Sequence, residues 1–217
     1  MNLPNKITIS RIVLIVGMLI ALLVLACIPN LVVPDVGDSR INWVYLGATI
    51  IFIIAAATDC LDGQIARRCN LVTDLGKFLD PIADKLLNDG MMIFILVPQA
   101  YALSQRRDPM ALTILMFCVV LMIGRDLVVD ALRLIAVKKN IVIAANIFGK
   151  LKTVLQMIAI PMMLLNDWPF YYIYQNNPNY PEFLNISNIF FYIATIMSLI
   201  SGIIYVYQNR EVLKQDK

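Results

Sequence analysis

Residues 43–95 read WVYLGATIIFIIAAATDCLDGQIARRCNLVTDLGKFLDPIADKLLNDGMMIFI. Apolar runs lie at both ends of this stretch, and its polar centre contains Asp59, Asp62, Asp80 and Asp84. Acidic residues are rare inside membrane spans and usually serve a function there. The pattern therefore predicts two membrane helices, joined by a short turn, whose acidic residues meet near that turn.

The rest of the chain has the same apolar character. Of its 217 residues, 60% are hydrophobic and only 15% are charged, whereas soluble domains are about half apolar and a quarter charged. A span needs about 20 apolar residues, and strands are disfavoured because lipid leaves their edges unpaired. We predict an all-α membrane protein with a single domain, residues 1–217, and a short N-terminal interfacial segment. Six transmembrane helices are expected at approximately 7–28, 42–67, 79–104, 110–137, 150–166 and 186–207.

Basic residues predict the orientation of these helices. With the N-terminus in the cytoplasm, Arg40, Arg106 and Arg107 are the basic residues of the outer loops, and most others lie at the inner side. Cytoplasmic loops carry the excess of Lys and Arg. We therefore expect both termini, and the acidic residues near the first inner turn, on the cytoplasmic side.

Composition also excludes several kinds of chemistry. The chain has no histidine, which removes mechanisms that need an imidazole base, nucleophile or ligand. Cys27, Cys60, Cys69 and Cys118 are scattered and form no C-x-x-C pair, so neither a zinc site nor a disulfide framework is indicated. The net charge of +3 is too small to indicate a nucleic-acid partner.

The acidic residues form two helical pairs. Asp59 and Asp62 are three apart and Asp80 and Asp84 four apart, so each pair shares one helix face. Carboxylates without His or Cys favour Mg²⁺, Mn²⁺ or Ca²⁺ over zinc, and four of them could hold two ions for phosphoryl chemistry. The alternative is that these acids only pair with basic residues at a hydrated helix end. Those basic residues are Arg67, Arg68, Lys77 and Lys85.

The spacing of this stretch carries a family resemblance. The pattern D-x2-D-G-x2-A-R-x8-G-x3-D-x3-D is matched from Asp59 to Asp84 and resembles the signature of the CDP-alcohol phosphatidyltransferases. The resemblance implies that a CDP-linked lipid gives its phosphatidyl group to an alcohol and releases CMP. It implies divalent metal, Mg²⁺ or Mn²⁺ and two ions, held by Asp59, Asp62, Asp80 and Asp84, with Asp84 also as the base.

Contacts to the CDP-lipid are implied by the same resemblance and by the N-terminus. Residues 4–11 read PNKITISR, similar to the opening of the bacterial phosphatidylglycerolphosphate synthases, a branch of that family. A plain membrane-entry segment is the alternative reading of these residues. The implied CDP-lipid contacts are Asn5, Thr8, Asp62, Gly63, Ala66, Arg67, Thr73 and Gly76.

A second set of charged residues points to the acceptor alcohol. Intramembrane cations need anions, and Arg125, Arg133, Lys150 and Lys152 could bind the phosphate of glycerol 3-phosphate. Their segments, including G-K-x-K-T-x-x-Q at 149–156, are similar to those of glycerophosphate-using members of the family. Asp126 stands where those members commonly have glutamate, and Asp130 is a further departure. Internal pairing of Arg125 and Arg133 with Asp126, Asp130 or Asp89 is the alternative.

Together these features predict an enzyme of phospholipid biosynthesis in the bacterial inner or plasma membrane. The expected reaction transfers phosphatidyl from CDP-diacylglycerol to sn-glycerol 3-phosphate, giving phosphatidylglycerol phosphate and CMP. A homodimer in the lipid bilayer is the assembly that the family resemblance implies. Three alternatives remain open: another acceptor (inositol phosphate, phosphatidylglycerol or serine), a cation transporter, and an inactive paralogue.

Overall fold

The structure is a computed structural model, and it is helical, with no strand among the residues that it describes. It describes residues 3–28, 33–37, 41–68, 73–97, 108–139, 147–174 and 180–210, with backbone alone at 3, 4, 60–68, 74 and 77. Contacts divide the chain into two compact units. The first comprises Met1–Arg107 and Ile160–Tyr180, and the second comprises Asp108–Ala159 and Pro181–Lys217.

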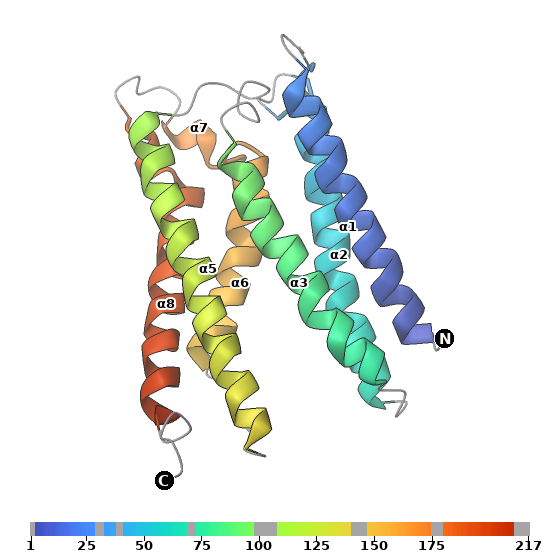
Figure 1. Cartoon of the computed structure of the whole chain (residues 1–217). Helices are drawn as coiled ribbons and strands as arrows, with labels where there is room; N and C mark the ends of the chain where they lie inside the picture. The colour runs from blue at the N-terminus through green and yellow to red at the C-terminus, as the bar shows by residue number, and fades with distance from the viewer. Residues whose placement is uncertain are drawn as a thin grey trace. The chain divides into compact units, whose positions relative to one another are not determined.

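Three helices form most of the first unit: α1 (Leu3–Cys27), α2 (Trp43–Arg68) and α3 (Asp74–Ile95). They lie side by side, and α1 contacts both α2 and α3 (Figure 1). The predicted N-terminal interfacial segment lies within this helix, which is continuous from Leu3 into the first apolar run. Its place relative to the membrane stays a prediction. Pro4 lies in the first turn of α1, where a proline removes no helical hydrogen bond.

One face of α1 is buried along its whole length. Ile15, Met18, Leu22 and Ala26 are each at most 8% exposed and follow the three-to-four-residue period of a helix. Between them, Val13, Val16, Ile20 and others remain exposed although they are apolar. Large exposed apolar faces are typical of contact with lipid. The buried face therefore marks the side of α1 that packs on α2 and α3.

Helix α2 ends at Arg68 and α3 begins at Asp74, so α3 differs from the expected third span of 79–104. Thr73 is the N-cap of α3, and its hydroxyl accepts a hydrogen bond of 3.1 Å from the Gly76 N–H. At the other end the Leu96 N–H bonds back to the Ile93 carbonyl, which closes the helix. The helix thus begins earlier and ends earlier than hydrophobicity suggested, and it places Asp80 and Asp84 in its first turns.

The second unit contains α5 (Pro109–Lys138), α8 (Ile186–Gln208), the 3₁₀ helix η1 (Glu182–Leu184) and most of α6 (Ile147–Leu164). Helices α5 and α8 pack along each other (Figure 1). They run in the same direction, because Met122 contacts Thr195, Arg125 contacts Ser201 and Val129 packs with Tyr205. The expected spans at 110–137, 150–166 and 186–207 agree with these helices to within a few residues.

The aromatic segment after α6 belongs to the first unit. It contains the single-turn helix α7 (Tyr171–Tyr174). The Tyr174 hydroxyl donates to the buried Asp167 carboxylate, and the Tyr174 ring stacks on Tyr180 with centroids 4.6 Å apart. These rings suit a membrane–water interface.

By length and composition, four helices of the described residues can cross a membrane. They are Asn5–Cys27, Pro109–Lys138, Ile147–Leu164 and Ile186–Gln208, and Trp43–Asp59 is a shorter apolar helix. Helix α3 is absent from this set because its first half is rich in charge. The chain is a multi-pass membrane protein, and the full number of spans remains a prediction, as does the single domain.

Candidate functional site

The buried face of α1 is polar at its N-terminal end. Asn5, Thr8 and Arg11 follow at intervals of three residues and are only 5%, 2% and 4% exposed. Residues three apart lie on one helix face. All three side chains therefore belong to the same face as the buried apolar residues, the face that packs on α2 and α3. Buried polar groups need partners, and the partners come from these two helices.

Arg11 joins the two acidic helices. Its Nη1 donates a hydrogen bond to Asp59 Oδ1 on α2, and its Nη2 lies 3.8 Å from Asp80 Oδ1 on α3. The Thr8 hydroxyl also donates to Asp80 Oδ1, at 3.2 Å. Arg11 is nearly buried, with 3% of its side chain exposed, whereas the carboxylates are 37% and 49% exposed. Two carboxylates from different helices thus converge on one cationic group and remain accessible.

The predicted nucleotide-side residues Asn5, Thr73 and Gly76 also lie together. The Thr73 hydroxyl donates to Asn5 Oδ1 at 2.7 Å while it caps α3. A Cβ at Gly76 would lie 3.2 Å from that same Asn5 oxygen, so any larger residue would push Asn5 away. The geometry explains why glycine suits this position, and it ties the start of α1 to the start of α3.

Asp84, the predicted base, lies one helical turn beyond Asp80 and is exposed. The Asn88 amide, four residues further along α3, donates to Asp84 Oδ1 at 2.7 Å. This contact fixes the orientation of the carboxylate. Sequence reasoning missed Asn88, although its i, i+4 spacing from Asp84 was the available signal.

The remaining predicted ligands belong to the end of α2. Asp62, Gly63, Ala66 and Arg67 are in the helix, but their side chains lie outside the described part. Among the described side chains, no group of three or more His, Cys, Asp or Glu is close enough to hold a metal ion. The cluster of all four aspartates therefore stays a prediction.

The described carboxylates nevertheless suit a divalent cation. Asp59 and Asp80 supply hard oxygen atoms, which Mg²⁺ and Mn²⁺ prefer. Their convergence on the Arg11 guanidinium shows that positive charge is stabilised at this point. Arg11 therefore supplies, between α2 and α3, positive charge of the kind that a divalent metal ion would supply.

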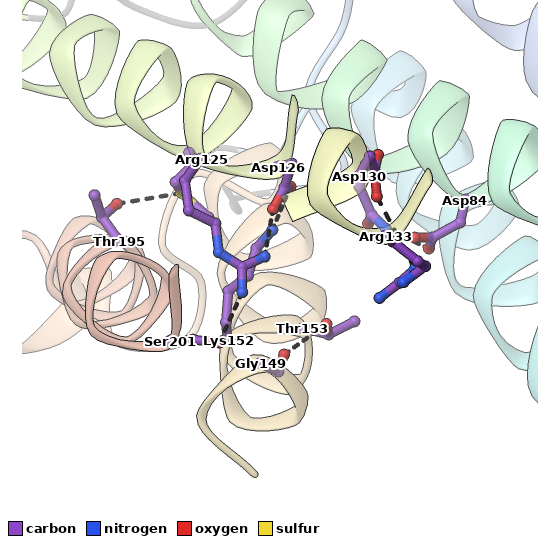
Figure 2. A network of polar contacts seen from close by, with 12 residues as sticks. Asp84, Arg125, Asp126, Asp130, Arg133, Gly149, Lys152, Thr153, Thr195 and Ser201 are labelled. Atoms are coloured by element: carbon purple, nitrogen blue, oxygen red, sulfur yellow. Dashed lines mark hydrogen bonds and ion pairs between the residues drawn. The ribbon is translucent and has the colours of Figure 1, made fainter. Parts of the chain in front are cut away.

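The four predicted acceptor residues belong to the second unit, where they separate into two sets. Arg125 and Lys152 are 14% and 9% exposed, and both bind the Asp126 carboxylate, Arg125 at 2.8 Å and Lys152 at 2.5 Å (Figure 2). The Arg133 side chain is 56% exposed, and its Nη1 lies 4.0 Å from Asp130 Oδ1. Lys150 is also exposed. The internal pairing considered for Arg125 is therefore present, and Lys152 shares it.

Ser201 of α8 completes the buried set. Arg125 Nη2 donates to the Ser201 hydroxyl at 2.7 Å. Hydrophobicity gave no reason to single out α8, but its buried face contains Ser198, Ser201 and Tyr205 at helical spacing. That polar stripe was the missed signal.

Comparison with known proteins identifies the family of the chain. A model of the CDP-alcohol phosphatidyltransferase family matches residues 1–200. A Bacillus subtilis (strain 168) protein named CDP-diacylglycerol–glycerol-3-phosphate 3-phosphatidyltransferase is 38% identical over 213 residues, 98% of this chain and 97% of its own length. A Mycoplasma pneumoniae protein of that name is 34% identical over 98% of this chain and 89% of its own length.

A third relative carries a different name. It is a cardiolipin synthase (CMP-forming) of Oryza sativa subsp. japonica, 39% identical over 127 residues, 56% of this chain and 37% of its own length. Since the family model spans nearly the whole chain and relatives match at full length, the chain belongs to the CDP-alcohol phosphatidyltransferase family.

Proposed function

We propose that the chain transfers a phosphatidyl group from CDP-diacylglycerol to sn-glycerol 3-phosphate, giving phosphatidylglycerol phosphate and CMP. The observation that carries the proposal is the convergence of Asp59 and Asp80, both members of the family signature, on Arg11. The names of the full-length relatives in Bacillus subtilis and Mycoplasma pneumoniae support the acceptor.

Divalent metal is part of this proposal. Asp59, Asp62, Asp80 and Asp84 would hold Mg²⁺ or Mn²⁺, in keeping with the general use of divalent metals in the family. Bound there, the metal would supply positive charge that neutralises the pyrophosphate of the CDP-lipid. Asn5, Thr8, Gly63, Ala66, Arg67, Thr73 and Gly76 are proposed to contact the CDP-lipid beside it.

Asp84 is proposed as the general base. It takes the proton from a free hydroxyl of the acceptor, whose oxygen then attacks the phosphorus that bears the diacylglycerol. The bond from that phosphorus to the bridging oxygen breaks, and CMP leaves with the electron pair. Asn88 holds one carboxylate oxygen of Asp84, so the base is oriented before the acceptor arrives.

The membrane arrangement follows from the same reasoning. We propose six spans with both termini and the active site on the cytoplasmic side, and α2 and α3 as spans that carry the catalytic acids at their inner ends. A homodimer, inferred from family membership, is the proposed assembly.

The acceptor phosphate is proposed to bind four basic residues of the second unit: Arg125, Arg133, Lys150 and Lys152.

An acceptor screen tests the proposed reaction. Purified protein with CDP-diacylglycerol and Mg²⁺ or Mn²⁺ is expected to release CMP with glycerol 3-phosphate, and not with serine, inositol phosphate or phosphatidylglycerol. The cardiolipin synthase similarity makes phosphatidylglycerol the most important comparison. Preference for it would change the acceptor, and metal-dependent cation flux without CMP release would favour a transporter instead.

Asp84→Asn tests the base. The amide keeps the shape of the side chain but accepts a proton poorly, so kcat is expected to fall by about a hundredfold or more. Much of the binding of metal and CDP-diacylglycerol should remain. Asp35→Asn, at an exposed aspartate in a loop of the first unit, is the control and should turn over normally. Substantial turnover by Asp84→Asn would remove Asp84 from this role.

Arg11→Met tests whether Arg11 stands in for a cation. Without divalent metal, Asp59 and Asp80 would then repel each other, and stability should fall by about 1 kcal/mol, a modest loss because both carboxylates are partly exposed. Mn²⁺ should restore more stability to this variant than it adds to the parent, measured by thermal unfolding in detergent. Lys6→Met, at an exposed residue of the same helix, is the control. An equal Mn²⁺ effect in all three proteins would contradict the interpretation.

A further inference from the structure

The buried cations of the second unit are held from three helices. Asp126 is adjacent to Arg125 on α5 and binds both the Arg125 and Lys152 side chains, and Lys152 comes from α6. Ser201 comes from α8 and accepts a hydrogen bond from Arg125 Nη2 (Figure 2). The guanidinium is therefore fixed by one carboxylate and one hydroxyl that come from different helices.

The backbone of α8 also shapes the space around Arg125. A Cβ at Gly202 would lie 2.7 Å from Arg125 Cγ and 3.3 Å from its Nε. Cγ is near the root of the side chain, so the whole guanidinium would have to move to make room. A Cβ at Gly149 of α6 would lie 3.2 Å from the Ser201 hydroxyl. Glycine at these positions lets Arg125 lie directly against α8.

The charges of this set do not cancel. Arg125 and Lys152 carry two positive charges, and Asp126 carries one negative charge. No other carboxylate of the described residues forms an ion pair with either cation. In addition, the Arg125 Nε–H is buried without a hydrogen-bond partner among the described residues. A buried excess of positive charge favours an anionic ligand.

We propose that Ser201 and Gly202 of α8 are positioning residues for the acceptor phosphate, because they set the place of the Arg125 guanidinium. The inference rests on the proposed function, since it assumes that Arg125 and Lys152 bind the phosphate of glycerol 3-phosphate. It adds α8 to the acceptor site. The excess positive charge beside Asp126 would then explain a preference for an alcohol that bears a phosphate. Neither residue touches the acceptor itself.

Gly202→Ala tests this inference without a change of charge. Displacing Arg125 should raise the KM for glycerol 3-phosphate about tenfold, the effect of losing one hydrogen bond to a charged group. The KM for CDP-diacylglycerol and the kcat at saturating acceptor should stay near the parent values. Gly124→Ala is the matched control, because a Cβ at Gly124 of α5 meets nothing within 4 Å.

Ser201→Ala is the milder variant, and it keeps the test valid if Gly202→Ala fails to fold. It should raise the KM for glycerol 3-phosphate about threefold or more, and Ser201→Thr, which retains the hydroxyl, should restore it. Parallel changes in both KM values, or a fall in kcat alone, would indicate a merely structural role and overturn the inference. An unchanged KM in Ser201→Ala would overturn it too.

Failure of the proposed function would look different. In that case the parent protein itself would not release CMP with glycerol 3-phosphate, whatever stands at position 202. If the parent does use glycerol 3-phosphate and the α8 variants match Gly124→Ala, only the positioning role is wrong.

Discussion

The placement of one guanidinium organises the first unit. Arg11 is nearly buried on α1 and meets a carboxylate from α2 and another from α3. A charge in so apolar a setting is costly unless it is paired. Because the partners come from two helices, the pairing fixes how α1, α2 and α3 meet at their polar ends. The Thr8 hydroxyl adds a second contact to Asp80, and the hydrogen bond from Thr73 to Asn5 joins the start of α3 to α1.

Each of the two units contains a group of three charges in which one ion pairs with two ions of the opposite sign, and the signs are reversed between the units. In the first unit, one cation lies between two carboxylates, which leaves a negative excess that suits a divalent metal. In the second unit, one carboxylate lies between two cations, which leaves a positive excess that suits a phosphate. In each case the shared ion holds the other two in place, so the charges that are proposed to bind ligands are oriented in advance. Phosphatidyl transfer to a phosphorylated alcohol needs both kinds of site.

Much of this could be predicted from the sequence. Long apolar runs located the helices, and the spacing of Asp59, Asp80 and their neighbours located the acidic site. Hydrophobicity failed for α3, because Thr73 sets its start through a local cap and not through apolar character. It failed again for Ser201 and Gly202, because their contacts with Arg125 depend on how α5 packs on α8. Arg11 belongs to the N-terminal segment that carries the family resemblance, but its pairing with both acids could be seen only in the fold.

Asp59 and Asp80 are expected to act on one cation although they belong to different helices. Mn²⁺ binding to the metal-free protein, measured by calorimetry or electron paramagnetic resonance in Asp59→Asn, Asp80→Asn and the double variant, tests it most directly. Each single substitution should weaken binding, and the double variant should lose less than the sum of the two by about 1 kcal/mol, because both carboxylates serve the same ion. Strictly additive losses, or unchanged Mn²⁺ affinity in either single variant, would contradict the account.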